Sequence, residues 1–174
     1  MQTAIRFIGV VNAAIWLGSA VGFTVVVGPA FFSSEMLGIF PRPYAARAVE
    51  VVIGRLYSFQ MLCAFVALLH LAFEYFQQPR PPSRFHVGLL TVLLGLNLAG
   101  TFWLLPTMHQ LEAVRYSDAT TVEQKTLAKQ RFGFWHGSSQ VVNLGVMLAL
   151  GYHLWRLTRP ADKPRFSSFS KFRG

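Results

Sequence analysis

The chain has 174 residues, of which 53% are hydrophobic and only 13% are charged. An ordinary soluble domain carries roughly 25% charged residues, so one water-surrounded core could not hide this much apolar surface. Cys63 is the single cysteine, which excludes an internal disulfide framework and CxxC metal motifs. The net charge of +9 lies beside apolar stretches, so it favours anionic lipid headgroups as the partner and argues against nucleic acid.

Four apolar stretches are candidates for membrane-spanning helices, each of which needs about 20 residues. They cover about residues 7–32, 56–76, 87–105 and 132–155. The first is longer than the ~7–15 apolar residues of a signal peptide, so we expect it to be retained. The sequence therefore predicts an all-α membrane protein, an antiparallel four-transmembrane-helix bundle.

The connections are marked by proline and polar residues. Pro29 is expected to kink or end the first helix, and residues 33–46 to form a loop with a short interfacial turn. The second helix is expected to begin as early as Ala45. A proline-rich link at residues 77–84 leads to the third helix.

The third and fourth helices are predicted to form a hairpin that projects from the bilayer. The third should continue past Pro106 toward Tyr116, although Pro106 should bend it. Thr121 and Gln124 fit a capping box, so the fourth helix should begin near Thr121 and run to about Leu157. Residues 1–158 then form the transmembrane domain, and residues 159–174 form a basic tail.

The distribution of Lys and Arg predicts the orientation in the membrane. The N-terminus, the link at residues 77–84 and the tail share one side, and that side carries the larger number of basic residues. Because cytoplasmic segments are enriched in Lys and Arg, both termini are expected on the cytoplasmic side. We expect a multi-pass protein of the cell (inner) membrane.

A polar stripe on the fourth predicted helix is the main candidate site. It consists of His136, Ser139, Gln140 and Asn143, which are spaced so that they share one helical face. Because unpaired polar groups are costly in lipid, this face should point into the bundle. There it would meet polar residues of the other helices, namely Asn12, Gln60, Asn97 and Thr101.

Two interpretations of this stripe stay open. Ser, Gln and Asn often hold membrane helices together, and in the first interpretation the stripe is structural. Alternatively His136, Ser139, Gln140 and Asn143 form a ligand or ion site with Asn97 and with Arg55, an ionisable residue at membrane depth. Arg55 could equally extend to the interface.

The histidines raise the possibility of a haem or metal site. His70 and His153 both lie toward the predicted cytoplasmic side, and two histidines facing each other across a bundle would suggest haem ligation. His136 is a further candidate, because imidazole also binds metal ions. No HxxxH or ExxH spacing supports a metal site within one helix, so no cofactor is expected, although haem or copper remains possible.

Several segments resemble a known family. The stretch Phe134–Leu144 resembles the "HG-S---NL" signature of the transmembrane protein 205-like family, also catalogued as domain of unknown function 4149. Three shorter segments resemble its other motifs, namely 27–32, 48–57 and 105–108, although Val49 and Tyr57 replace the usual Gly and Phe. The resemblance covers about residues 7–157 and implies a four-helix membrane fold with no established reaction, distantly similar to copper-resistance protein D and to a haem-binding protoporphyrinogen oxidase.

Three functional hypotheses follow from the sequence. The first is a non-enzymatic membrane protein whose polar site binds or passes a small ligand or metal ion. The second is an accessory subunit, packed in a homo-oligomer or a larger membrane complex. The third is a haem-dependent oxidoreductase that uses His70, His136 or His153.

Overall fold

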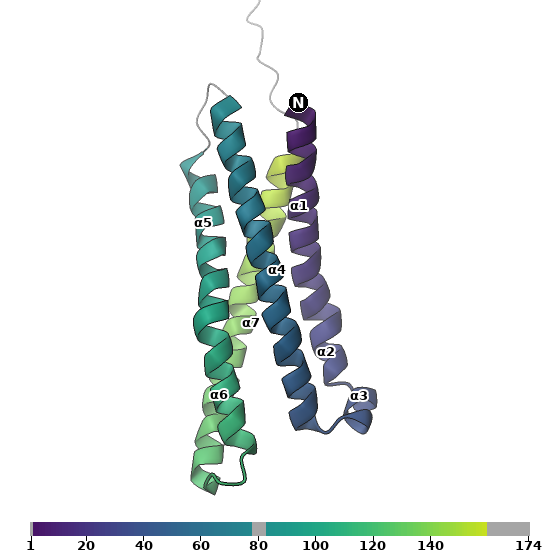
Figure 1. Cartoon of the computed structure of the whole chain (residues 1–174), viewed down its shortest axis with the longest axis vertical. Helices are drawn as coiled ribbons and strands as arrows, with labels where there is room; N and C mark the ends of the chain where they lie inside the picture. Colours follow the sequence, from purple (N-terminus) through teal and green to yellow (C-terminus); the bar gives the residue numbers. More distant parts are fainter. Residues whose placement is uncertain (1, 78–82, 160–174) are drawn as a thin grey trace, which may run out of the picture.

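The computed structural model describes residues 2–77 and 83–159, and every regular element in these two ranges is helical. Four long helical segments run side by side in alternating directions, as the chain colouring of Figure 1 shows. The predicted tail and most of the link at 77–84 lie outside the described residues.

The first two segments form one hairpin. Its first limb consists of α1 (Gln2–Gly22), a π-helical turn η1 (Phe23–Val27) and α2 (Gly28–Phe31). The short helix α3 (Ser34–Ile39) connects it to α4 (Arg42–Gln77). The stretch predicted as a loop is therefore largely helical. Ser33 caps α3 by accepting a hydrogen bond from the Met36 N–H, and Pro43 stands in the first turn of α4, where a missing N–H costs nothing.

The second hairpin has the same organisation. Its first limb consists of α5 (Arg84–Ala99), a second π-helical turn η2 (Gly100–Leu104) and α6 (Leu105–Tyr116). A short turn then leads to α7 (Val122–Thr158). As predicted, the third helix ends at Tyr116 and a complete capping box at Thr121 and Gln124 starts the fourth.

Both π-helical turns precede a proline at the same spacing. In η1 the Gly28 N–H bonds to the Phe23 carbonyl, and Pro29 follows; in η2 the Leu105 N–H bonds to the Gly100 carbonyl, and Pro106 follows. Proline lacks an N–H and its ring collides with the preceding turn, so a widened turn lets the helix continue. This accounts for helices that continue through both prolines instead of ending there.

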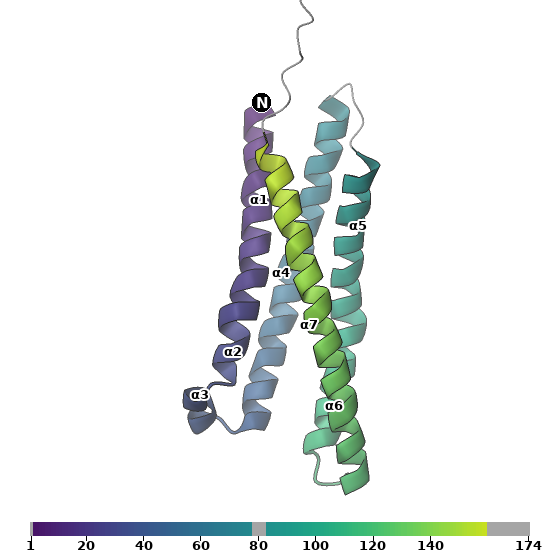
Figure 2. The same ribbon diagram turned by 180° about the vertical axis from the view of Figure 1, so that it is seen from behind.

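The two hairpins pack through two main pairs of helices. These pairs are α1 with α7 and α4 with α5. Within the hairpins, α1 contacts α4, and α6 packs along the first part of α7. Figure 2, seen from behind, shows α7 crossing from the α6 end toward α1. Toward the end that carries α3, the first hairpin diverges from the α6–α7 hairpin in both views.

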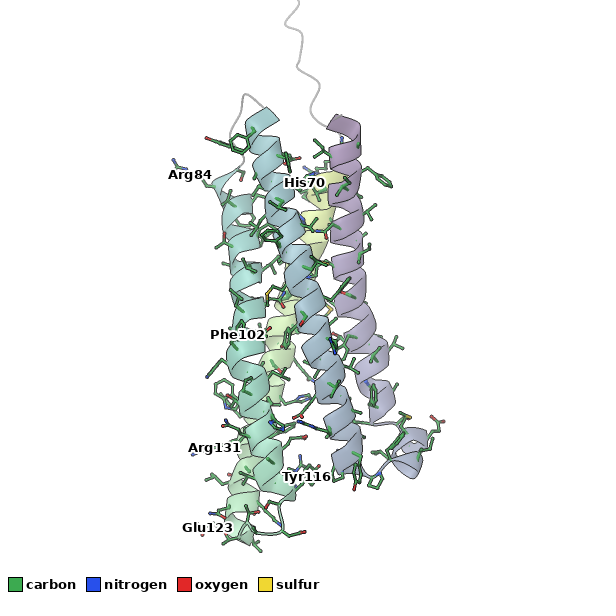
Figure 3. All side chains as sticks on the ribbon, in the orientation of Figure 1. His70, Arg84, Phe102, Tyr116, Glu123 and Arg131 are labelled. Atoms are coloured by element: carbon green, nitrogen blue, oxygen red, sulfur yellow. The ribbon has the colours of Figure 1, made fainter. Side chains whose placement is uncertain are left out.

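The distribution of apolar residues is the reverse of that in a soluble bundle. Much of the core is alanine, including Ala13, Ala20, Ala64 and Ala67, each at most 2% exposed. Large apolar side chains face outward instead, for example Phe102, which is labelled in Figure 3 and is 72% exposed. Small residues at helix contacts and large apolar residues outside are typical of helices packed in lipid.

Three helical stretches are long and apolar enough to cross a membrane: Ala4–Phe31, Arg42–Phe76 and Arg84–Tyr116. They include the first three predicted spans. The helix α7 is not among them, because polar residues such as His136, Gln140 and Asn143 interrupt its apolar part. A fourth span within α7 therefore remains a prediction.

Candidate functional site

A partly open cavity of about 180 Å³ lies between α4, the α5–η2 limb and α7. Most of its wall is apolar, with Leu93, Val142 and Val146 among the lining side chains. Its polar wall residues carry hydroxyl or amide groups: Tyr57, Gln60, Asn97, Ser138, Ser139 and Asn143. No charged side chain of residues 2–77 and 83–159 lines it.

Asn97 is the least satisfied polar group of this wall. The residue is 5% exposed, and its side-chain Oδ1 is buried with no hydrogen-bond partner among the described residues. A buried acceptor without a partner costs about 1–3 kcal/mol, so such atoms are rare in folded proteins. Among the described residues, Asn97 is therefore the wall residue with a buried side-chain atom left without a partner.

The π-helical turn η2 and two tryptophans shape the cavity. Gly100, the first residue of η2, lies so close to Tyr57 that an added Cβ would stand 2.7 Å from the tyrosine ring. Trp103 and Trp135 meet edge to face on the other side, with ring centroids 4.8 Å apart and an interplanar angle of 85°. The wall therefore combines flat aromatic surfaces with a few hydrogen-bonding groups.

The structure divides the polar stripe predicted on α7. Ser139 and Asn143 line the cavity, where Asn97 also lies. Asn143 in addition donates a hydrogen bond from Nδ2 to Thr24 Oγ1 at 2.7 Å, which ties α7 to η1. His136 and Gln140 are exposed instead, and their side chains are 3.0 Å apart. The expectation that the whole stripe points into the bundle is therefore wrong for these two residues, which lie at the edge of the cavity-facing side.

Arg55 lies apart from the cavity. Its exposed side chain lines a shallow, more open groove between α1, η1 and α4, together with Ser19, Phe23 and Phe59. Arg55 and Asn97 are therefore not brought together, because the face of α4 that carries Arg55 differs from the face that carries Tyr57 and Gln60. Elsewhere on α4, Arg47 and Glu50, three residues apart, form an ion pair at 2.6 Å.

The histidine cluster forms a second polar region, at the end of the bundle that carries the N-terminus. His70 on α4, His86 on α5 and His153 on α7 are 6%, 3% and 1% exposed. Figure 3 marks His70 near this end. The sequence pattern pointed to His70 and His153 but not to His86, which the turn after the proline-rich link brings beside them.

These histidines do not fit a haem or metal centre in their present arrangement. The rings of His86 and His153 stack on each other, with centroids 5.0 Å apart and a tilt of 32°, so they cannot both point at an iron between them. Among the described residues, no group of three or more His, Cys, Asp or Glu side chains is arranged to hold a metal ion. We therefore do not assign these histidines as ligands of a haem or of copper.

The fold and the cavity define a small helical protein with apolar helices suited to a membrane. Residues 11–117 match the family described as Domain of unknown function (DUF4149), and the chain belongs to this family. The match covers the first apolar stretch from residue 11 onward and the whole of the other two, but it ends before α7. No curated protein and no solved structure matches the chain.

Several cavity residues were absent from the sequence prediction. Tyr57 lies one turn before Gln60, and Trp135 lies one turn before Ser138 and Ser139, so helical spacing from the polar residues could have indicated both. Trp103 gave no such signal, because its position depends on the widened turn η2.

Proposed function

We propose that the chain is an integral membrane protein of four transmembrane helices, with both termini on the cytoplasmic side of the cell membrane. Support for a fourth span comes from α7, which packs against α1 and α6 and exposes Phe134, Val141 and Leu148. If the other helices lie in lipid, the neighbouring part of α7 lies there too. The larger number of Lys and Arg near the termini supports the orientation.

Accessibility of introduced cysteines tests this topology. In a Cys63→Ala background, one variant carries Ser83→Cys, just before α5, and the other carries Ala119→Cys, in the α6–α7 turn. In bacterial spheroplasts that express the protein, a membrane-impermeant maleimide should label the Ala119 position directly and the Ser83 position only after permeabilisation. Labelling of both positions from outside, or the reverse pattern, would contradict the proposal.

We propose further that the protein binds a small, largely apolar ligand in the cavity between α4, α5–η2 and α7. The observation that carries this proposal is the buried, unpartnered Oδ1 of Asn97 in the wall of a 180 Å³ cavity. Binding sites are typically apolar cavities with a small number of placed polar groups, which is the composition found here. The proposed role is the binding or passage of a ligand, and the transmembrane protein 205-like resemblance of Phe134–Leu144 adds no reaction to it.

A cavity-filling substitution tests this role. The probe is 4-fluorotoluene, whose ¹⁹F resonance reports saturable binding to the detergent-purified protein above linear partition into detergent. Ser138→Phe should place a ring in the cavity and reduce saturable binding at least tenfold, because cavities lined by packed side chains cannot widen freely.

Ser58→Phe is the matched control. Ser58 is exposed on α4 and outside the cavity, and its hydroxyl donates to the Gly54 carbonyl within its own helix. This variant should bind the probe as the unchanged protein does. Absence of saturable binding to the unchanged protein, or equal loss in both variants, would refute the proposed site.

A further inference from the structure

We infer that the cavity selects an uncharged, ring-sized ligand that donates a hydrogen bond to Oδ1 of Asn97. This inference rests on the proposed binding function and specifies its ligand class. The residues that form the wall restrict the size, the charge and the polarity of the ligand separately.

The size of the cavity favours a single ring. A cavity of about 150 Å³ in another protein holds benzene, and the present one measures about 180 Å³. The same volume equals the share of roughly six waters in the liquid, each of which needs 2–4 polar partners. The hydroxyl and amide side chains of the wall alternate with apolar ones such as Leu93, Val142 and Val146, so much of the surface offers water no partner and a largely apolar organic molecule fits better than a cluster of water.

The wall also excludes charge. Among the described residues, the hydrogen-bonding side chains that line it are neutral hydroxyls, amides and the indoles of Trp103 and Trp135, and Arg55, the ionisable residue predicted nearby, lines a different groove. Moving an ion from water into an apolar site without an opposite charge costs far more than neutral hydrogen bonds return. Carboxylates and ammonium ions are therefore disfavoured, while the edge-to-face pair of Trp103 and Trp135 offers flat surfaces to a neutral ring.

The polarity of the ligand follows from Asn97. The backbone carbonyl of Asn97 accepts from the Thr101 hydroxyl, 2.9 Å away, and from the Gly100 N–H at the start of η2, so the backbone is well bonded. The side-chain Oδ1, in contrast, is a buried acceptor without a donor among the described residues, and because it has almost no accessible surface, the Asn97 side chain has to turn toward the cavity to meet a ligand. A ligand hydroxyl that donates to Oδ1 removes this cost, whereas a methyl group in the same place leaves it.

The experiment compares 4-fluorophenol with 4-fluorotoluene, two probes that differ by a hydroxyl in place of a methyl group, and with 4-fluorobenzoate, which carries a charge. For each protein the preference is the ratio of the saturable affinities for the phenol and the toluene, measured by ¹⁹F NMR. Replacing Asn97 by Leu should lower this ratio about tenfold, because the toluene loses nothing and the phenol loses its acceptor. Taking the ratio cancels the different hydrophobicity of the two probes.

The matched control is Thr91→Val on the same helix. Thr91 is exposed and donates only to the Val87 carbonyl, so this variant should leave the preference ratio unchanged. The benzoate should show no saturable binding to any of the proteins.

A measurement on the unchanged protein keeps the inference testable even if Asn97→Leu fails to fold. The sequence contains asparagine only at positions 12, 97 and 143, so ¹⁵N-asparagine labelling gives a simple set of side-chain amide signals. The fluorophenol should shift the Asn97 signal more than the fluorotoluene does. Asn12 donates to the Cys63 carbonyl and serves as the internal reference.

The outcomes separate the inference from the proposed function. If both neutral probes bind saturably but the ratio and the Asn97 signal do not respond, the cavity binds ligands and the hydrogen-bond inference is wrong. Saturable binding of the benzoate at the cavity would overturn the exclusion of charge. If neither neutral probe binds, the proposed function itself fails.

Discussion

Gly9→Ala should lower the free energy of unfolding of the purified protein by about 1–3 kcal/mol, the usual cost of an overpacked core. Gly9 lies on α1 against the imidazole of His70, and an added Cβ would stand 2.5 Å from Nε2 and 2.8 Å from Cε1. Cβ atoms essentially never lie within 3.0 Å of another heavy atom in this way, so the His70 ring or the helix α1 has to move. Thermal unfolding in detergent, followed by circular dichroism, measures the effect.

The ring of His70 has little room to move away. His70 is 6% exposed, and His86 and His153, which are still more deeply buried, belong to the same cluster. Displacing this imidazole therefore disturbs the packing of α1 against α4. Gly9 therefore differs from a glycine whose neighbour is a flexible side chain, because such a side chain could move away with little loss of stability.

Gly18→Ala on the same helix is the matched control. Gly18 is exposed, and its added Cβ would meet nothing within 4 Å. Alanine favours helix over glycine by about 1 kcal/mol, so this variant should be as stable as the unchanged protein or slightly more stable. If Gly9→Ala were equally stable, the close packing of α1 on the histidine cluster would be disproved.

The sequence could predict most of the helical arrangement because strong local signals mark it. Apolar stretches located the four helical segments, and the capping box at Thr121 and Gln124 located the start of α7. The loop predicted at residues 33–46 was wrong, because proline was taken as a helix breaker although Pro43 stands in the first helical turn.

The candidate site was less predictable, because it depends on how helices are turned toward each other. Helical spacing put His136, Gln140 and Asn143 on one face, but it could not show that the edge of this face remains outside the bundle. The shape of the cavity depends also on η2, a turn that no residue pattern marked beyond the presence of Pro106. Cross-helix contacts such as Gly100 with Tyr57 become visible only in three dimensions.

Gly100→Ala should abolish saturable binding of 4-fluorotoluene while changing stability much less than Gly9→Ala does. The added Cβ would lie 2.7 Å from Cε1 and Cζ of Tyr57, so here too the ring has to move. Unlike His70, however, Tyr57 borders a cavity of about 180 Å³, and the ring can relax into that space. The substitution then relieves its own clash by filling the ligand site.

Gly95→Ala, on the same limb and with open space around its added Cβ, should bind the probe normally. The pair thus separates a general effect of alanine from the specific displacement of Tyr57. Adding Tyr57→Phe to Gly100→Ala should not restore binding, because the ring and not the hydroxyl blocks the cavity, whereas Tyr57→Ala should restore it by removing the ring. Normal binding by Gly100→Ala, or a large loss of stability without restoration by Tyr57→Ala, would show that η2 and Tyr57 do not shape the ligand site as described.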